Sequence, residues 1–149
     1  MIAIAAPTAA PIAALVVAGL FTGAAFYINF AEHPARMHLP PEQARVQWAP
    51  AYKRGYAMQV SLAVLGGLLG LAAWWMDSQL VWCAGAVLML ANWPWTLAAI
   101  MPVNRLLLAP PPGSDCAALL RRWNRLHGVR TLPGAGAMLC FMAGLAARV

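Results

Sequence analysis

The residues with the greatest capacity for chemistry lie in the last third of the chain, where Trp123, His127 and Arg130 are separated by four and three positions. On a helix this spacing places the three side chains on one face, whereas Arg125 points away from it. Histidine exchanges a proton near neutral pH, and arginine carries a permanent positive charge. The set favours a functional pocket over the simpler interpretation, in which the histidine caps a carbonyl and the arginine snorkels to an aqueous interface.

Three other segments carry polar and aromatic residues that belong with this set. In two of them the residues fall on a single helical stripe, and in the third an asparagine follows a proline at the end of an apolar run. The residues are Thr22, Phe26, Asn29 and His33 in the first segment, Tyr52, Tyr56 and Gln59 in the second, and Asn104 after Pro102 in the third. We expect these side chains to face the inside of one bundle.

The elements that position these residues follow from the composition. The chain has 149 residues, of which 62% are hydrophobic and 9% are charged, whereas soluble domains are about 45–50% apolar and about 25% charged. A helix that crosses the hydrocarbon takes ~20 residues, so four helices use most of the chain. We therefore predict an all-α fold, an integral membrane four-helix bundle. The net charge of +6 then reflects contact with lipid headgroups, and we expect no nucleic acid partner.

Runs without charged residues define the predicted spans. They cover about 9–31, 53–76, 79–102 and 117–147 of a single transmembrane domain, residues 1–149, with loops at 32–52 and 103–116. Pro34 and Pro102 are expected to end the first and third helices, because proline lacks the N–H that a helix interior needs. A short turn at Asp77 and Ser78 makes a hairpin of the second and third helices.

Basic residues predict the orientation of the bundle. They concentrate in and beside the two longer loops, and the hairpin turn has none. The positive-inside rule therefore places both long loops in the cytoplasm and the N and C termini outside, and we expect a bacterial cytoplasmic membrane. The polar residues named above all lie near the cytoplasmic end, whereas the opposite half is apolar. A pore needs polar lining across the whole bilayer, so a cavity is favoured over a channel.

Four phrases of the sequence extend this interpretation: EHPARM, WAPAYKRGYAMQ, MPVNRLLL and WNRLHGVRTLPG. Together they resemble the anthrone oxygenase-like family of small four-helix membrane proteins, over nearly the whole chain. The resemblance implies oxidation of a polyketide anthrone to an anthraquinone with O₂, without a required metal or flavin. It falls on Pro34, Tyr52, Arg54, Pro102, Asn104, Trp123, His127 and Arg130.

The resemblance also implies a role for each candidate residue. Loss of one proton turns an anthrone into an enolate that can pass an electron to O₂, so the site needs a base and groups that stabilise the oxyanion. His127 would be the base, and Arg130, Arg54 and Asn104 would stabilise the oxyanion. Glu32 would orient His127 or neutralise an arginine. The remaining substrate-binding candidates are Trp123, Tyr52, Tyr56, Asn29, Gln59 and Phe26.

Two alternatives stay open at this point. A metal- or haem-dependent membrane oxidoreductase would use His33, His38, His127 and Glu32 as ligands, although Pro34 and the five-residue spacing of His33 and His38 give no prearranged pair. A non-enzymatic subunit that binds lipid or quinone would need the same inward residues. The expected partners are a hydrophobic aromatic small molecule, O₂ and membrane lipid, and pairing of the chain with itself is also open.

Overall fold

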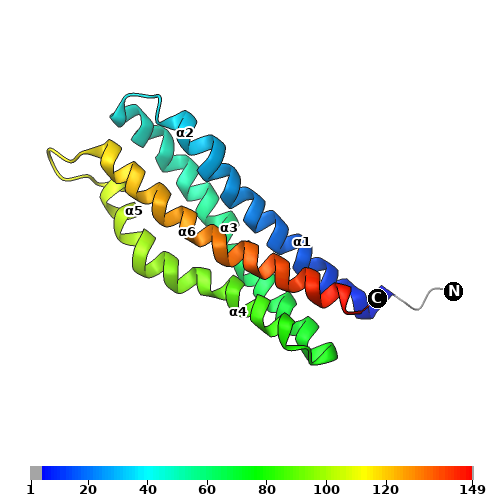
Figure 1. Cartoon of the computed structure of the whole chain (residues 1–149). Helices are drawn as coiled ribbons and strands as arrows, with labels where there is room; N and C mark the ends of the chain where they lie inside the picture. Colours follow the sequence, from blue (N-terminus) through cyan, green and yellow to red (C-terminus); the bar gives the residue numbers. More distant parts are fainter. Residues whose placement is uncertain (1–4, 149) are drawn as a thin grey trace.

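The protein is described by a computed structural model that covers residues 5–148. Within that range it is entirely helical and contains no strand. The segments are α1 (Ala5–Tyr27), the π-helical turn η1 (Ile28–Glu32), α2 (His33–Arg36), α3 (Pro41–Asp77), α4 (Leu80–Trp95), the π-helical turn η2 (Thr96–Ile100), α5 (Met101–Leu108) and α6 (Cys116–Ala146). Because η1 and η2 join their neighbours without a break, these segments form four long antiparallel rods (Figure 1).

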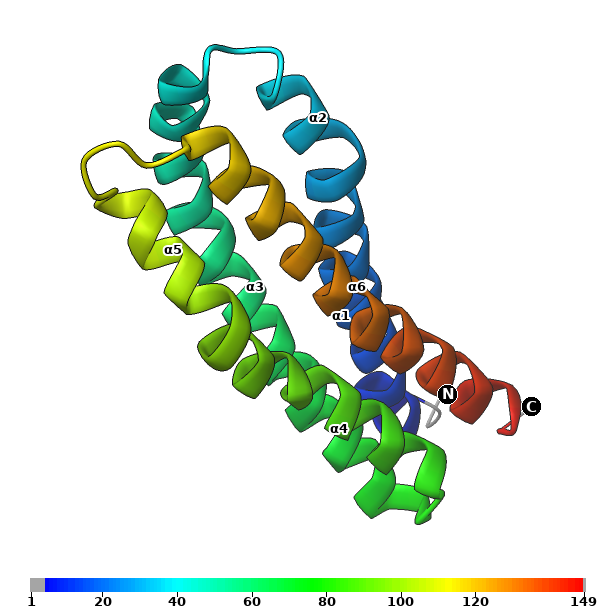
Figure 2. The same ribbon diagram turned by 60° about the vertical axis from the view of Figure 1, so that its left-hand side comes forward.

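The four rods pack as a ring in which α1 contacts α3 and α6, and α4 contacts the same two helices (Figure 2). Each rod is long and apolar enough to cross a membrane. Large apolar side chains such as Leu20, Leu68 and Leu139 are exposed on the outside of the bundle, as expected of a surface that meets lipid. The prediction of an all-α four-helix bundle is confirmed, and the sidedness of its loops and termini stays a prediction.

The prediction that Pro34 and Pro102 end their helices is wrong. Each proline follows a π-helical turn, closed by a bond from the His33 N–H to the Ile28 carbonyl in η1 and from the Met101 N–H to the Thr96 carbonyl in η2. The wider turn leaves each proline at the start of a new helical segment, where its missing N–H and its ring are tolerated. The first and third rods therefore continue to Arg36 and Leu108.

The predicted loop at 32–52 is also mostly helical. Helix α3 begins at Pro41, twelve residues before the predicted span, and only residues 37–40 connect it to α2. Proline suits this first position because its fixed φ matches the helix. Hydropathy predicts only the apolar part of a helix. The first turns of α3 are polar, so the hydropathy pattern did not include them in the predicted span. By contrast, α6 begins within one residue of its predicted start, where Asp115 Oδ1 accepts a hydrogen bond from the Ala118 N–H at 2.9 Å.

The interior divides into two clusters along the bundle. The cluster near the α3–α4 turn contains Phe21, Trp82 and Phe141. The cluster near the α2–α3 and α5–α6 connections contains Trp48, Leu107 and Trp123. At the far end Arg148 holds Asp77 with Nη2–Oδ2 and Nε–Oδ2 distances of 2.6 and 2.9 Å, which ties the end of the chain to the α3–α4 turn. The predicted polar residues gather around the second cluster.

Gly85 on α4 is required by close packing against Phe141. An added Cβ would lie 2.3 Å from Phe141 Cε1, and the buried ring cannot move aside. We expect Gly85→Ala to lower the free energy of unfolding in detergent micelles by about 1–3 kcal/mol, the usual cost of overpacking. Gly23→Ala is the control, because its Cβ meets no described atom within 4 Å. An unchanged unfolding midpoint for Gly85→Ala would contradict this packing.

Candidate active site

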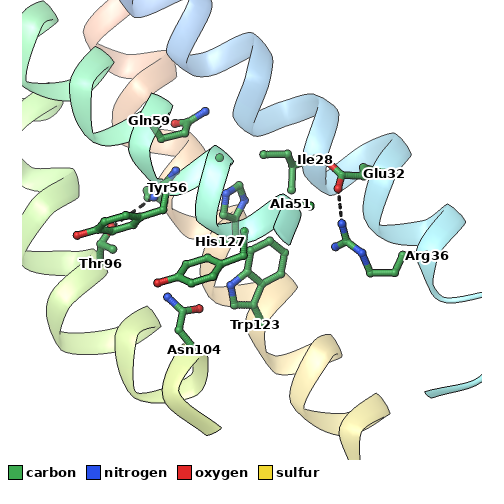
Figure 3. A pocket seen from close by; sticks show the side chains of 13 residues that line it. Ile28, Glu32, Arg36, Ala51, Tyr56, Gln59, Thr96, Asn104, Trp123 and His127 are labelled. Carbon is green, nitrogen blue, oxygen red and sulfur yellow. Dashed lines mark hydrogen bonds and ion pairs between the residues drawn. The ribbon is translucent and has the colours of Figure 1, made fainter. Parts of the chain in front are cut away.

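A pocket with about 430 Å³ of empty space, its open mouth included, lies in the half of the bundle nearest the α2–α3 and α5–α6 connections. All four rods contribute to its wall, and both π-helical turns lie beside it. The lining residues are Ile28, Glu32, Arg36, Ala51, Tyr52, Gly55, Tyr56, Gln59, Thr96, Asn104, Trp123, His127 and Arg130 (Figure 3).

Aromatic rings form one wall of the pocket. The Trp123 ring stacks on the His127 imidazole with centroids 4.9 Å apart (Figure 3). Trp48 connects Trp123 to Tyr52. Its ring meets Trp123 edge-on, with 5.8 Å between ring centres, and stacks on Tyr52 at 4.8 Å. Tyr56 follows at 5.9 Å from Tyr52. Trp123, Tyr52 and Tyr56 thus give the pocket an aromatic wall beside a histidine, which suits an aromatic ligand.

Arg130 brings a buried positive charge to this wall. Only 5% of the residue is exposed, and no carboxylate among residues 5–148 pairs with it. Its Nη1 lies 3.5 Å from Thr96 Oγ1, and its guanidinium stands 5.5 Å from the Phe21 ring centre. An unpaired buried charge is costly, so a site that retains one has a use for an anion.

The second arginine of the pocket, Arg36, is neutralised. It pairs with Glu32 one helical turn earlier and donates from Nε to Gln47 Oε1 (Figure 3). Of the two roles predicted for Glu32, neutralising an arginine is therefore the one observed. The contrast between a paired Arg36 and an unpaired Arg130 concentrates positive charge on one side of the pocket.

Several polar atoms on the wall have no hydrogen-bond partner among the described residues. They are Trp123 Nε1, Arg130 Nε, Arg36 Nη1, Gln59 Oε1 and Asn104 Oδ1. Gln59 is held by its other end, since its Nε2 donates to the Phe21 carbonyl at 3.2 Å. Buried polar groups are nearly always paired, so this group of atoms fits a ligand that carries both donors and acceptors.

The structure brings together most of the predicted site residues. Eight of them line the pocket: His127, Arg130, Asn104, Trp123, Tyr52, Tyr56, Gln59 and Glu32. Asn29 lies behind His127, with its Oδ1 2.7 Å from the imidazole Nδ1. Three predicted residues lie outside the lining, which corrects their assignment: Asn29 stands behind His127, Arg54 is exposed, and Phe26 is 56% exposed and stacks on Phe30.

Sequence reasoning missed Arg36 and Thr96 as pocket residues. Arg36 was counted with the loop charges, although its spacing of four from Glu32 was a usable signal for an ion pair on one helical turn. Thr96 lies on the wall through η2, and its Oγ1 donates to the Asn92 carbonyl at 2.7 Å. Arg36 and Thr96 each make a structural contact and also line the pocket.

The ligand set considered for a metal is not brought together. Within residues 5–148 no group of three His, Cys, Asp or Glu side chains has an arrangement that could hold a metal ion. His38 is exposed in the connection after α2, and His33 is buried beside Trp123, 6.0 Å between ring centres. His33, His38, His127 and Glu32 therefore do not form one ligand set in the described part of the chain.

Two comparisons with known proteins found similarity to this chain. A sequence model of the family described as "Anthrone oxygenase" matches residues 48–140, which contain Tyr52, Asn104, His127 and Arg130. A protein of Claviceps purpurea (strain 20.1), described as "Anthrone oxygenase", is 30% identical over 154 aligned residues, which cover 91% of this chain and 88% of that protein.

No solved structure matches the chain. The relative is fungal, so the comparisons lend no support to the predicted bacterial membrane. The family match spans more than half of the chain, and the alignment with the relative reaches nearly all of it. The chain belongs to the anthrone oxygenase family.

Proposed function

We propose that the protein oxidises an anthrone-like aromatic ketone to the corresponding quinone with O₂, inside the membrane. One observation carries the proposal: a buried arginine that has no carboxylate partner among residues 5–148 lies in the same aromatic-walled pocket as His127. That combination suits a flat, apolar substrate that becomes an anion during the reaction. Family membership supports an oxygenase, and the description of the fungal relative supports an anthrone as the substrate class.

The chemistry balances without another reactant. An anthrone carries a CH₂ group opposite its ketone, and one O₂ converts this group to a second carbonyl while one oxygen atom leaves as water. The base removes the first CH₂ proton, and the resulting enolate gives an electron to O₂. The radical pair then forms a C–O bond, and the resulting peroxide takes back the first proton from the base to become a hydroperoxide. Removal of the second C–H proton breaks the O–O bond and forms the second carbonyl, and the departing hydroxide takes up that proton and leaves as water.

We assign the proton transfer and the stabilisation of charge to residues that line the pocket. His127 takes the first proton, and Arg130 holds the enolate oxygen. The Trp123 indole N–H and the Asn104 amide supply further hydrogen bonds on the wall, and the rings of Tyr52 and Tyr56 align the substrate. Arg54, which the sequence assigned to the oxyanion, has no part in this scheme because its side chain points out of the bundle.

The proposal requires no metal or organic cofactor, since the electron passes directly from the delocalised enolate to O₂. Both reactants are apolar and dissolve in lipid. A second, apolar groove of about 270 Å³ adjoins the pocket and shares Tyr56 and Thr96 with it. Trp93 and Leu97 complete that groove and are 49% and 55% exposed on the lipid-facing side of α4 and η2. A substrate from the bilayer therefore has an apolar place next to Tyr56.

The test measures O₂ consumption and quinone absorbance with detergent-purified protein and a panel of anthrones and hydroquinones. We expect one O₂ consumed for each quinone formed, with no loss of rate after treatment with a chelator. Uptake that stops after chelation and returns with one metal would overturn the cofactor-free scheme. Saturable binding of quinones without any O₂ uptake would instead identify a binding subunit, and the enzymatic proposal would be wrong.

A further inference from the structure

Asn29 makes three contacts that link the first rod to α6. It lies in η1, and its side-chain nitrogen Nδ2 is 2.8 Å from the Asn124 carbonyl oxygen and 2.7 Å from Asn124 Oδ1. Its Oδ1 is 2.7 Å from Nδ1 of His127. Asn29 is half-buried and does not line the pocket. It therefore contacts the ligand site only through the histidine.

The Asn124 carbonyl sets the direction of these hydrogen bonds. A backbone carbonyl oxygen accepts and never donates, so the Asn29 atom that faces it must be the NH₂ group. The other end of the amide, facing His127, is then the oxygen Oδ1. An amide oxygen carries no hydrogen, so the hydrogen in this 2.7 Å contact has to come from Nδ1 of the imidazole.

We infer that Asn29 is a positioning residue that holds the neutral His127 ring in its Nδ1-protonated tautomer and leaves the Nε2 lone pair for the pocket. A neutral imidazole has one N–H, so protonation at Nδ1 makes Nε2 the basic nitrogen. The hydrogen bond alone would let the imidazole ring tilt about Nδ1. Stacking on Trp123, with ring planes 27° apart, restricts that tilt. The inference deepens the proposed function and rests on it for the role of His127 as the base.

The backbone around these residues suits the contact. Gly128, next to His127, leaves room for the amide, since an added Cβ would lie 3.5 Å from Asn29 Nδ2. The π-helical turn η1 supplies Asn29 from the neighbouring first rod. Such turns occur often at functional sites, where the widened turn redirects a side chain.

The direct test is ¹⁵N NMR of the protein labelled at its histidine ring nitrogens, at a pH where His127 is neutral. Protonated and bare ring nitrogens differ widely in chemical shift, and His127→Gln identifies the signals of His127 among those of His33 and His38. We expect a protonated Nδ1 and a bare Nε2. Finding the proton on Nε2 in the unmodified protein would overturn the inference.

Three variants separate positioning from folding. Asn29→Leu removes the acceptor, so we expect a mixture of tautomers and a kcat about 10–100-fold lower, the usual cost of losing a partner that orients a working histidine, with little change in KM. Asn29→Asp keeps an acceptor toward Nδ1 and should retain the tautomer. Asn124→Ala removes one acceptor but keeps the backbone carbonyl, and should retain both the tautomer and most of the rate.

The NMR result needs no substrate, so it is independent of the proposed reaction. A protonated Nδ1 that persists in Asn29→Leu would show that Asn29 does not determine the tautomer. If the tautomer responds as expected but no anthrone is oxidised, the positioning inference stands and the proposed function fails. If Asn29→Leu does not fold, Asn29→Ala removes the same acceptor with a smaller side chain, and a Nδ1 proton that persists in that variant would overturn the inference.

Discussion

Replacing His127 with glutamine is expected to reduce the rate of anthrone oxidation by about 10²–10⁴-fold, the usual contribution of a positioned general base. The glutamine amide can still donate to Asn29 Oδ1 and fill much of the same space, but it cannot take up the substrate proton. We therefore expect the unfolding midpoint in micelles to stay close to that of the unmodified protein. Initial rates of O₂ uptake with a saturating anthrone measure the effect.

His38→Gln is the matched control for this prediction. The same substitution is made at an exposed histidine in the connection after α2, outside the pocket. We expect its rate to match that of the unmodified protein. A His127→Gln variant that folds and keeps more than about a tenth of the rate would show that another group removes the proton.

Arg130→Met is expected to lower kcat by about 10²–10³-fold, in the range seen when an oxyanion-stabilising group is lost. The physical reason is that the substrate oxygen becomes negatively charged only when the enolate forms. The positive charge of Arg130 therefore stabilises the enolate more than the neutral ketone. The same substitution removes a buried charge that has no carboxylate partner among the described residues. The free energy of unfolding should therefore not fall, and we expect activity and stability to change independently.

Arg125→Met provides the comparison on the same helix. Arg125 is exposed and lies outside the pocket, so its loss should leave both kcat and KM unchanged. The kcat and KM values of the two variants, measured from O₂ uptake over a range of anthrone concentrations, check the assignment. Equal kcat values for Arg130→Met and Arg125→Met would remove Arg130 from the mechanism.

Local periodicity accounts for the correct part of the predicted site. Trp123, His127 and Arg130 belong to one uninterrupted helix, so their shared face follows from the helical repeat alone. The same rule was sufficient to exclude Arg54, which stands two positions from both Tyr52 and Tyr56 on α3 and so points away from their stripe. Its assignment came from the family resemblance, which identifies residues that recur without saying which way they face.

The π-helical turns account for the incorrect part. In α1 the buried positions include Phe21 and Ala25, and Phe26 lies one residue outside that face. The extra residue in η1 then rotates the following positions by about 100°, one residue of an α-helix. This rotation brings His33 onto the inward face. A stripe drawn with a constant repeat runs through Phe26, whereas the real inward face shifts at Ile28–Glu32.

The sequence by itself was sufficient to predict a membrane bundle and the number of its helices. A helix that crosses hydrocarbon needs a long run of apolar residues, and each such run can be recognised locally in the sequence. It also determined which half of the bundle is polar. Only the tertiary structure decided which charges are paired and which histidine nitrogen faces the pocket. Those outcomes depend on contacts such as Asn29 with His127, 98 positions apart in the chain, and on two π-helical turns that keep the rods continuous past their prolines. No local pattern records the distance between side chains on different helices, so the chemistry of the pocket emerges only when the four rods pack.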